Sequence, residues 1–214
     1  MTKRHQRKHD VFRVALVGAE STGKTTLADN LAGHLCGVGY VVAVVPEVLR
    51  EWCVLHHRTP RQHEQLAIGK EQARRAIRLS HELEGIRGES PAVLIADTTP
   101  LMTAVYSDVL FGDSSLHRAA LAHQRWYDQT LLLEPDIPWI ADGIRDGEAI
   151  RSQVHARLLI LVEQLERWQA VRGSKGHRLA NTLASLESPN QRHNLAKMPH
   201  SASGIKAPIS RNKG

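Results

Sequence analysis

Residues 18–25 read Gly18-Ala19-Glu20-Ser21-Thr22-Gly23-Lys24-Thr25 and fit the pattern G-x-x-x-x-G-K-[ST] without a mismatch. An apolar run, residues 13–18 (RVALVG), leads into this stretch, and leucines at fourfold spacing follow it over residues 24–36. We therefore expect a buried strand, a loop and a helix. In that setting the glycines let successive N–H groups point inward, and the helix N-terminus favours anions. The pattern predicts a phosphate-binding loop in an α/β protein.

The residues of this motif make up the expected cofactor site. Lys24 would bridge the β- and γ-phosphate oxygens of ATP, and the Thr25 hydroxyl would hold Mg²⁺. The other predicted nucleotide contacts come from the loop and the helix start: Gly18, Glu20, Ser21, Thr22, Gly23 and Thr26. The alternative is a glycine-rich turn that caps an ordinary helix. We expect ATP and Mg²⁺ as the cofactors.

Two acids are expected at the same edge of the sheet as this loop. Asp97 ends the apolar run 92–97 (AVLIAD), an arrangement in which the carboxylate approaches Mg²⁺ directly or through a water. Glu47 follows the apolar run 40–45 (YVVAVV) and could orient a hydroxyl acceptor and take its proton. A strand-end cap and an acid at a helix N-terminus are the structural alternatives. Which acid is the base stays open, and Arg50 is a further candidate for contact with the acceptor.

The segment 135–147 (PDIPWIADGIRDG) is predicted to be a lid. Its Arg145, with Arg151 shortly after it, would stabilise negative charge on the γ-phosphate during transfer. Glycines in the segment permit closure. Trp139 either stacks on the acceptor or anchors the loop. The alternative for both arginines is a solvated surface position.

Short apolar runs alternate with longer amphipathic stretches between residues 10 and 187, which is typical of a parallel sheet with crossover helices. We expect one three-layer α/β domain there, with a mostly parallel five-stranded sheet. The remaining strands are predicted at 129–134 and 168–172, and the remaining helices at 46–53, 61–86, 99–110, 115–126, 148–167 and 177–186. Within 61–86 the apolar spacing predicts a buried stripe of Leu66, Gly69, Ala73, Ile77 and Leu83.

The net charge of +6 is concentrated at the two ends of the chain. Residues 1–9 hold four Lys/Arg and residues 188–214 hold five, with no acid in either, whereas residues 10–187 hold 19 bases and 22 acids. We expect flexible basic tails at 1–9 and 188–214, and nucleic acid as a partner only through them. The sequence leaves open whether the chain forms a homo-oligomer.

The expected compartment is the cytoplasm. Cys36 and Cys53 are too few for a disulfide framework, which favours a reducing environment. The apolar window at 11–19 is interrupted by Arg13 and is much shorter than the roughly 20 residues of a membrane span. We expect no membrane as a partner.

Five blocks, in this order along the chain, resemble the kinase domain of NadR-type ribosylnicotinamide kinases and the small AAA-type ATPases grouped with them. They are GAESTGKTTLADNLA (18–32), PEVLREW (46–52), AIGKEQ (67–72), LIADTTPLMTAVY (94–106) and IPWIADGIRD (137–146). The resemblance covers residues 11–186. It implies a P-loop NTPase fold and ATP- and Mg²⁺-dependent phosphorylation of nicotinamide riboside at its 5′-hydroxyl, giving nicotinamide mononucleotide for NAD synthesis. By position it implies phosphate contacts at residues 18 and 23–25, a metal and acceptor role for Asp97, and a lid position for Arg145.

Two features depart from this family. Aromatic residues flank the acid of the second block in riboside kinases, whereas Pro46 and Val48 flank Glu47 here, so Trp52 or Trp139 would have to supply the surface that stacks on the pyridinium. The chain also has no room for the DNA-binding or adenylyltransferase domains of multifunctional members, and we expect a stand-alone kinase domain. Two other functions stay open: an ATP-binding or ATP-hydrolysing regulatory protein whose basic tails bind nucleic acid or a partner, and a kinase for another nucleoside or nucleotide.

Overall fold

The computed structural model of the chain describes residues 11–139 and 148–186. Five strands in these residues form one sheet: β1 (Phe12–Val17), β2 (Val41–Val45), β3 (Ala92–Asp97), β4 (Gln129–Leu133) and β5 (Trp168–Val171). Their order is β2-β3-β1-β4-β5, and every pairing is parallel. The helices are α1 (Lys24–Gly37), α2 (Val48–His56), α3 (Gln62–Ile86), α4 (Pro100–Phe111), α5 (His117–Gln124), α6 (Glu148–Val162) and α7 (Lys175–Leu186).

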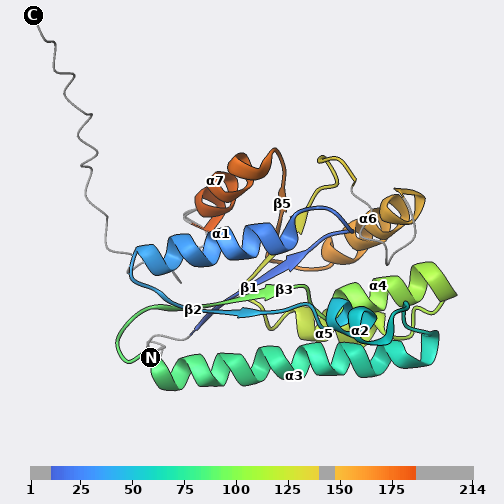
Figure 1. Ribbon diagram of the computed structural model, residues 1–214, viewed down its shortest axis with the longest axis horizontal. Coiled ribbons are helices and arrows are strands. Elements are labelled where there is room, and N and C mark those ends of the chain that lie inside the picture. Colours follow the sequence, from blue (N-terminus) through green and yellow to red (C-terminus); the bar gives the residue numbers. More distant parts are fainter. Residues whose placement is uncertain (1–10, 140–147, 187–214) are drawn as a thin grey trace, which may run out of the picture.

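The helices cover both faces of the sheet, which gives the three layers seen in Figure 1. One face carries α1 and α7, and the opposite face carries α2 to α6. Alternate residues of β1 explain this, because Val14 and Leu16 pack with the leucines of α1, whereas Ala15 and Val17 face the other helix layer. A strand that is buried on both faces reads as a continuous apolar run, and β1 and β3, which are buried along nearly their whole length, appear in the sequence as such runs.

The register brings the carboxyl ends of three strands to one edge of the sheet. Leu16 of β1 is paired with Asp97 of β3, and Val45 of β2 is paired with Ala96. The loop 18–23 follows β1, and two residues separate the end of β2 from the start of α2. In open parallel sheets, ligands bind outside this edge, where the strand order reverses.

Two expectations about helix boundaries were wrong in detail. Pro46 does not lie in the first turn of α2, because the helix begins at Val48 and the extended residue Glu47 (φ −71°, ψ 103°) is its N-cap. Helix α6 ends at Val162, five residues earlier than predicted. The predicted five-stranded, mostly parallel sheet is confirmed, and every pairing among the described strands is parallel.

The buried face of α3 also differs from the predicted stripe. Leu66 and Ile77 are 47% and 41% exposed. Leu83 is buried as predicted, but the other buried residues of the helix are Gln65, Ile68, Gln72, Ala76 and Ser80. Apolar spacing alone misplaces this face because three of its six positions are polar. Of these, the Gln65 and Gln72 side chains donate hydrogen bonds to backbone carbonyl oxygens.

Some expectations cannot be compared with the structure. The predicted tails at 1–9 and 188–214, and Arg145 in the predicted lid, lie outside the described residues. Across 11–139 and 148–186, no helix has both the length and the apolar character needed to cross a lipid bilayer.

Candidate active site

The loop between β1 and α1 is a close-packed cradle. Ser21 (φ 53°) and Gly23 (φ 77°) both have left-handed backbone conformations, which turn backbone N–H groups toward a common centre. A methyl group at Gly18 would lie 2.9 Å from the Leu133 carbonyl oxygen and 2.9 Å from Thr22 Oγ1. Only glycine fits there, so the first glycine of the motif is required for the loop to pack against β4.

Lys24, the first residue of α1, lies back over this loop. Its buried ammonium donates hydrogen bonds of 2.9 Å to the carbonyl oxygens of Gly18 and Ala19. Thr22 Oγ1 donates to the same Ala19 carbonyl at 2.9 Å. These bonds hold a positive charge against a ring of backbone dipoles, the position at which an anionic phosphate chain is favoured.

Thr25 and Asp97 form the oxygen-rich part of the site. Thr25 Oγ1 donates a hydrogen bond of 2.6 Å to Asp97 Oδ2, whereas the buried Asp97 Oδ1 has no hydrogen-bond partner within the described residues. Mg²⁺ prefers one or two carboxylate or hydroxyl oxygens together with waters and substrate phosphates. The hydroxyl of Thr25 and the incompletely bonded carboxylate of Asp97 fit that ion.

The electrostatics of Asp97 are set by its burial. Burial raises the pKa of its carboxyl group, the Thr25 hydrogen bond and the Lys24 ammonium lower it, and the Glu47 carboxylate raises it. The net pKa is higher than usual for an aspartate. A divalent cation at this carboxylate would lower the pKa again, because a positive charge favours the ionised form.

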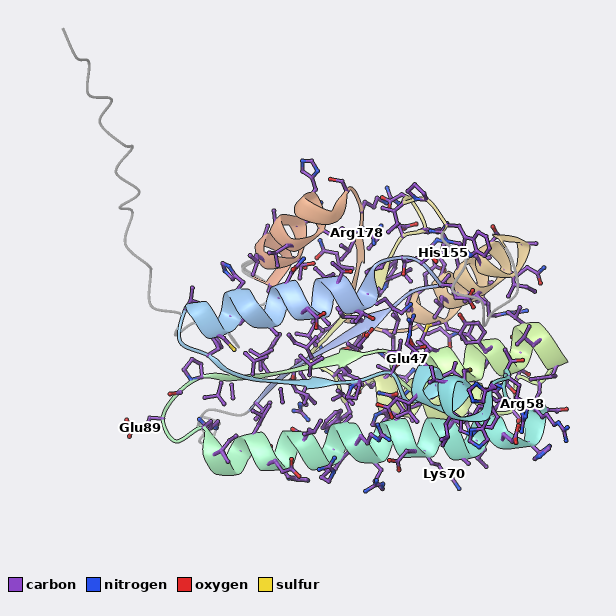
Figure 2. The ribbon with its side chains drawn as sticks, viewed as in Figure 1. Glu47, Arg58, Lys70, Glu89, His155 and Arg178 are labelled. Carbon is purple, nitrogen blue, oxygen red and sulfur yellow. The ribbon has the colours of Figure 1, made fainter. Side chains whose placement is uncertain are left out.

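Glu47 lies where β2 passes into α2 (Figure 2). Its side chain is 4% exposed, and Oε2 is 3.4 Å from Nε of Arg50, whose own side chain is 51% exposed. The structure therefore brings Glu47 to the same sheet edge as Asp97 and Lys24. Arg50 lies beside it, at the rim of the site.

Arg151 of α6 is buried against the phosphate-binding loop. Its Nη2 donates to the carbonyl oxygens of Ile137 at 2.8 Å and Ser21 at 3.4 Å. The side chain thereby joins α6 to the loop and to the first residues of the predicted lid. Trp139, the last described residue before 140–147, is half-buried.

An apolar pocket adjoins the loop at Glu20. It is a small pocket that is partly open to solvent. Its walls include Leu49 and Cys53 of α2, Gln65 of α3 and Tyr106 of α4, whose hydroxyl donates to Glu20 Oε1 at 3.1 Å. Trp52 is not part of these walls, and its ring stacks on His56 at 3.9 Å and lies 4.6 Å from the guanidinium of Arg58.

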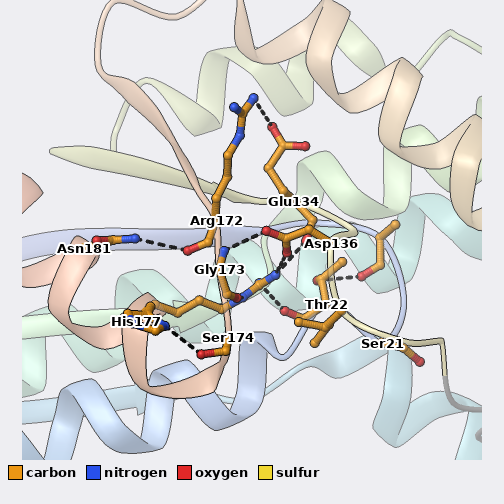
Figure 3. Close-up of polar contacts among 12 residues, drawn as sticks. Ser21, Thr22, Glu134, Asp136, Arg172, Gly173, Ser174, His177 and Asn181 are labelled. Carbon is orange, nitrogen blue, oxygen red and sulfur yellow. Dashed lines mark hydrogen bonds and ion pairs between the residues drawn. The ribbon is translucent and has the colours of Figure 1, made fainter.

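The sequence analysis missed Arg178 of α7, which is 2% exposed and holds several segments around the loop. Its guanidinium donates to the carbonyl oxygens of Thr22 (2.5 Å), Glu134 (2.8 Å) and Gly173 (2.8 Å), and pairs with Asp136. Figure 3 shows these contacts between the phosphate-binding loop, the end of β4 and the loop after β5. No motif surrounds Arg178 in the sequence, because its partners are mostly backbone carbonyls from distant segments.

Gln72 of α3 was also missed as a site residue, although the block 67–72 was noted for its resemblance. Its amide group bonds to the backbone around both acids of the site. A buried glutamine on a helix face that reads as polar gives no periodic signal.

The known proteins that resemble this chain carry a P-loop NTPase fold. Residues 13–175 match the family model of the AAA domain, and no curated protein sequence matches the chain. A crystal structure of NadR protein in complex with NR has a TM-score of 0.68 at 19% identity, and one in complex with NAD and AMP-PNP has 0.62 at 16%. The matches cover 92% and 90% of this chain but 55% and 52% of those chains, so this chain spans about half the length of the NadR chains.

A third similar structure is a whole kinase of comparable size. Thymidylate kinase from Ehrlichia chaffeensis has a TM-score of 0.60 at 14% identity, and the match covers 83% of this chain and 99% of that one. At these identities the shared feature is the fold. The resemblance inferred from the five sequence blocks is confirmed at the level of family and fold.

Proposed function

We propose that this chain, which belongs to the AAA-domain family, transfers the γ-phosphoryl group of ATP to a hydroxyl group of a small nucleoside. The observation that carries this proposal is the Thr25–Asp97 hydrogen bond of 2.6 Å beside the Lys24 loop, with buried Glu47 at the next strand end. An ATP hydrolase needs only Thr25, Asp97 and the Lys24 loop. A kinase also needs a carboxylate beside its acceptor.

The residues of this chain would divide the work as follows. The loop 18–23 and Lys24 bind the phosphate chain, and Thr25 with Asp97 would hold Mg²⁺, which when bound neutralises charge on the β- and γ-phosphate oxygens. Glu47 orients the acceptor hydroxyl and takes its proton while the oxygen bonds to the γ-phosphorus and ADP leaves. Arg151 keeps the loop in place through the Ser21 carbonyl, and Arg145 in the predicted lid is proposed to stabilise charge on the transferred group.

We propose nicotinamide riboside as the favoured acceptor, and the cytoplasm as the compartment. The five blocks of sequence support this choice, and so does the likeness to NadR structures, whose complexes contain NR or NAD. The pocket beside Glu20 has a mostly apolar lining, which suits the ring of such an acceptor. Neither Trp52 nor Trp139 lines this pocket. Because the Trp52 ring already contacts His56 and Arg58, we propose on the sequence alone that Trp139 stacks on the acceptor.

The test is a panel of nucleosides and nucleotides incubated with Mg-ATP, with products identified by mass and ADP release followed in parallel. We expect ADP release that depends on an acceptor, with nicotinamide mononucleotide as the main product. A different phosphorylated product would support the proposed kinase activity but show that the acceptor is another nucleoside or nucleotide. Slow ADP release that no acceptor accelerates would overturn the proposal in favour of an ATP-hydrolysing regulatory protein.

A further inference from the structure

Gln72 is the side chain through which α3 holds the two strand ends that carry the acids. Its Oε1 accepts a hydrogen bond of 2.8 Å from the Val48 N–H. Its Nε2 donates to the carbonyl oxygens of Pro46 at 3.2 Å and Thr98 at 3.3 Å. Gln72 is 2% exposed, so these bonds replace water at both strand ends.

The three partners surround the acids in the sequence. Pro46 precedes Glu47, Val48 follows it, and Thr98 follows Asp97. We propose that Gln72 is a positioning residue for phosphoryl transfer, which fixes the Glu47 backbone relative to that of Asp97. This inference rests on the proposed function for its catalytic consequence, but the hydrogen bonds themselves do not depend on it.

The backbone at these positions needs such support. Thr98 has a φ of 73°, a left-handed conformation that is strained for a β-branched residue and persists only where surrounding contacts enforce it. The Thr98 N–H is bonded to the Leu16 carbonyl at 3.2 Å, and its carbonyl is bonded to Gln72. Without Gln72, the Thr98 carbonyl oxygen would lose the hydrogen bond that it accepts from Gln72 Nε2.

The Gln72 amide has its one acceptor and both of its donors in use, and it bonds to the backbone beside each of the two acids.

A second link between α3 and α2 lies on the surface. Arg75 contacts Glu51 at 2.6 Å and Glu71 at 2.8 Å. Ion pairs that are this accessible to solvent contribute little to stability, because water and salt screen the charges. The interior bond to Val48 is therefore the one that fixes the start of α2, and the Arg75 pair provides a matched control.

The test replaces Gln72 by methionine, which keeps the volume and removes all three hydrogen bonds. We expect kcat to fall about 10- to 100-fold, because a small displacement of catalytic groups costs up to roughly that factor, while the KM for ATP changes less than about threefold. Independently of any acceptor, amide exchange at Val48 is expected to accelerate by about tenfold or more, because its N–H loses its partner. Gln72→Glu keeps the acceptor for Val48, and its activity relative to the native protein is expected to rise as the pH falls, because the protonated carboxyl group can donate again.

Two controls separate positioning from general stability. Arg75→Ala removes the surface link, and Gln129→Met replaces another buried glutamine at the opposite, amino end of β4; both are expected to keep the native kcat. The proposal is overturned if Gln72→Met keeps the native kcat, if Gln129→Met loses as much activity, or if the relative activity of Gln72→Glu is flat with pH. If the native chain phosphorylates no acceptor, the proposed function fails, and the Val48 exchange rate still decides whether Gln72 holds the strand end.

Discussion

Thr25 and Asp97 lie 72 positions apart in the chain, and the hydroxyl of the first donates a hydrogen bond of 2.6 Å to the carboxylate of the second. The bond joins the first turn of α1 to the carboxyl end of β3. It uses Asp97 Oδ2 and leaves Oδ1 buried without a partner among the described residues. The site therefore holds a desolvated carboxylate in place, at a cost in stability that a bound cation would offset.

Replacing Asp97 by asparagine is expected to separate stability from activity. Because the pKa of Asp97 is higher in the folded than in the unfolded chain, its contribution to stability is present at low pH and is lost as the pH rises through the folded-state value. The neutral amide avoids this loss, so Asp97→Asn should raise the Tm of the metal-free protein near pH 7. Activity with Mg-ATP should fall by about 10²- to 10³-fold. Thermal unfolding in EDTA at several pH values checks the first effect; equal Tm values for the two proteins near neutral pH would contradict it.

The proposed phosphoryl transfer by the native protein should also be lost on acidification at a higher pH than an ordinary aspartate would require. Asp97 must be ionised to hold Mg²⁺, and its pKa is raised. The acidic limb of the pH–kcat/KM profile should therefore lie above the usual range for an aspartate and move to lower pH as the Mg²⁺ concentration increases. If the position of the acidic limb does not change with the Mg²⁺ concentration, the limb reports the titration of a group other than Asp97.

Lys24→Met is expected to abolish transfer, with a loss of about 10³-fold or more in kcat/KM. The methionine keeps most of the buried stem but removes the ammonium that donates to Gly18 and Ala19. Lys70 of α3 is exposed (Figure 2), so Lys70→Met serves as the control and should retain native kinetics. Steady-state kinetics with ATP checks both variants; substantial turnover by Lys24→Met would show that the loop lysine is not needed.

Glu47→Gln is expected to lower kcat by about 10²- to 10⁴-fold while the affinity for ATP stays nearly unchanged. The amide preserves shape and burial but cannot take the acceptor proton. Glu51→Gln, one turn later on α2 with a side chain that is 45% exposed, is the matched control. Binding of ATP by calorimetry, measured beside turnover, tests the separation. Full activity in Glu47→Gln removes it as the base.

Gly18→Ala should prevent nucleotide binding, because the added methyl group would lie 2.9 Å from the Leu133 carbonyl oxygen. The loop would have to move away from β4. Gly33→Ala in α1 meets no atom within 4 Å and should stabilise the protein by about 0.5–1 kcal/mol, since alanine is the better helix former. Chemical denaturation and ATP binding are measured on both variants. Loss of ATP binding in Gly18→Ala, with normal binding and higher stability in Gly33→Ala, supports the packing described for the loop 18–23. The same behaviour in both variants would contradict it.

Arg178→Met is expected to lower the free energy of unfolding by about 3 kcal/mol, because it breaks a buried ion pair and leaves several carbonyl groups unpaired. Its partner Asp136 is ionised over a wide pH range: burial raises its pKa, but the Gly173 N–H and the Arg178 charge outweigh that and lower it overall. The stabilisation is thus present above the unfolded pKa and lost as the pH falls through the folded value. Arg172→Met, at a side chain that is 74% exposed, should have no measurable effect in urea unfolding.

The phosphate-binding loop and the strands could be predicted from the sequence because each depends on local pattern. The motif 18–25 specifies its own conformation through glycines at 18 and 23, and β1 and β3 appear as apolar runs because both faces of the sheet are covered. Asp97 and Glu47 could be proposed for the same reason, since parallel strands end at one edge.

The partners of Gln72 and Arg178 were decided by the tertiary structure alone. Both side chains are polar and buried, and their hydrogen bonds go to backbone carbonyl or N–H groups of segments far away in the chain. Every residue carries such backbone groups, so the identity of a partner residue leaves no trace in the sequence. Local patterns fixed which elements form, whereas only packing of those elements determined which buried amide and guanidinium would hold the site together.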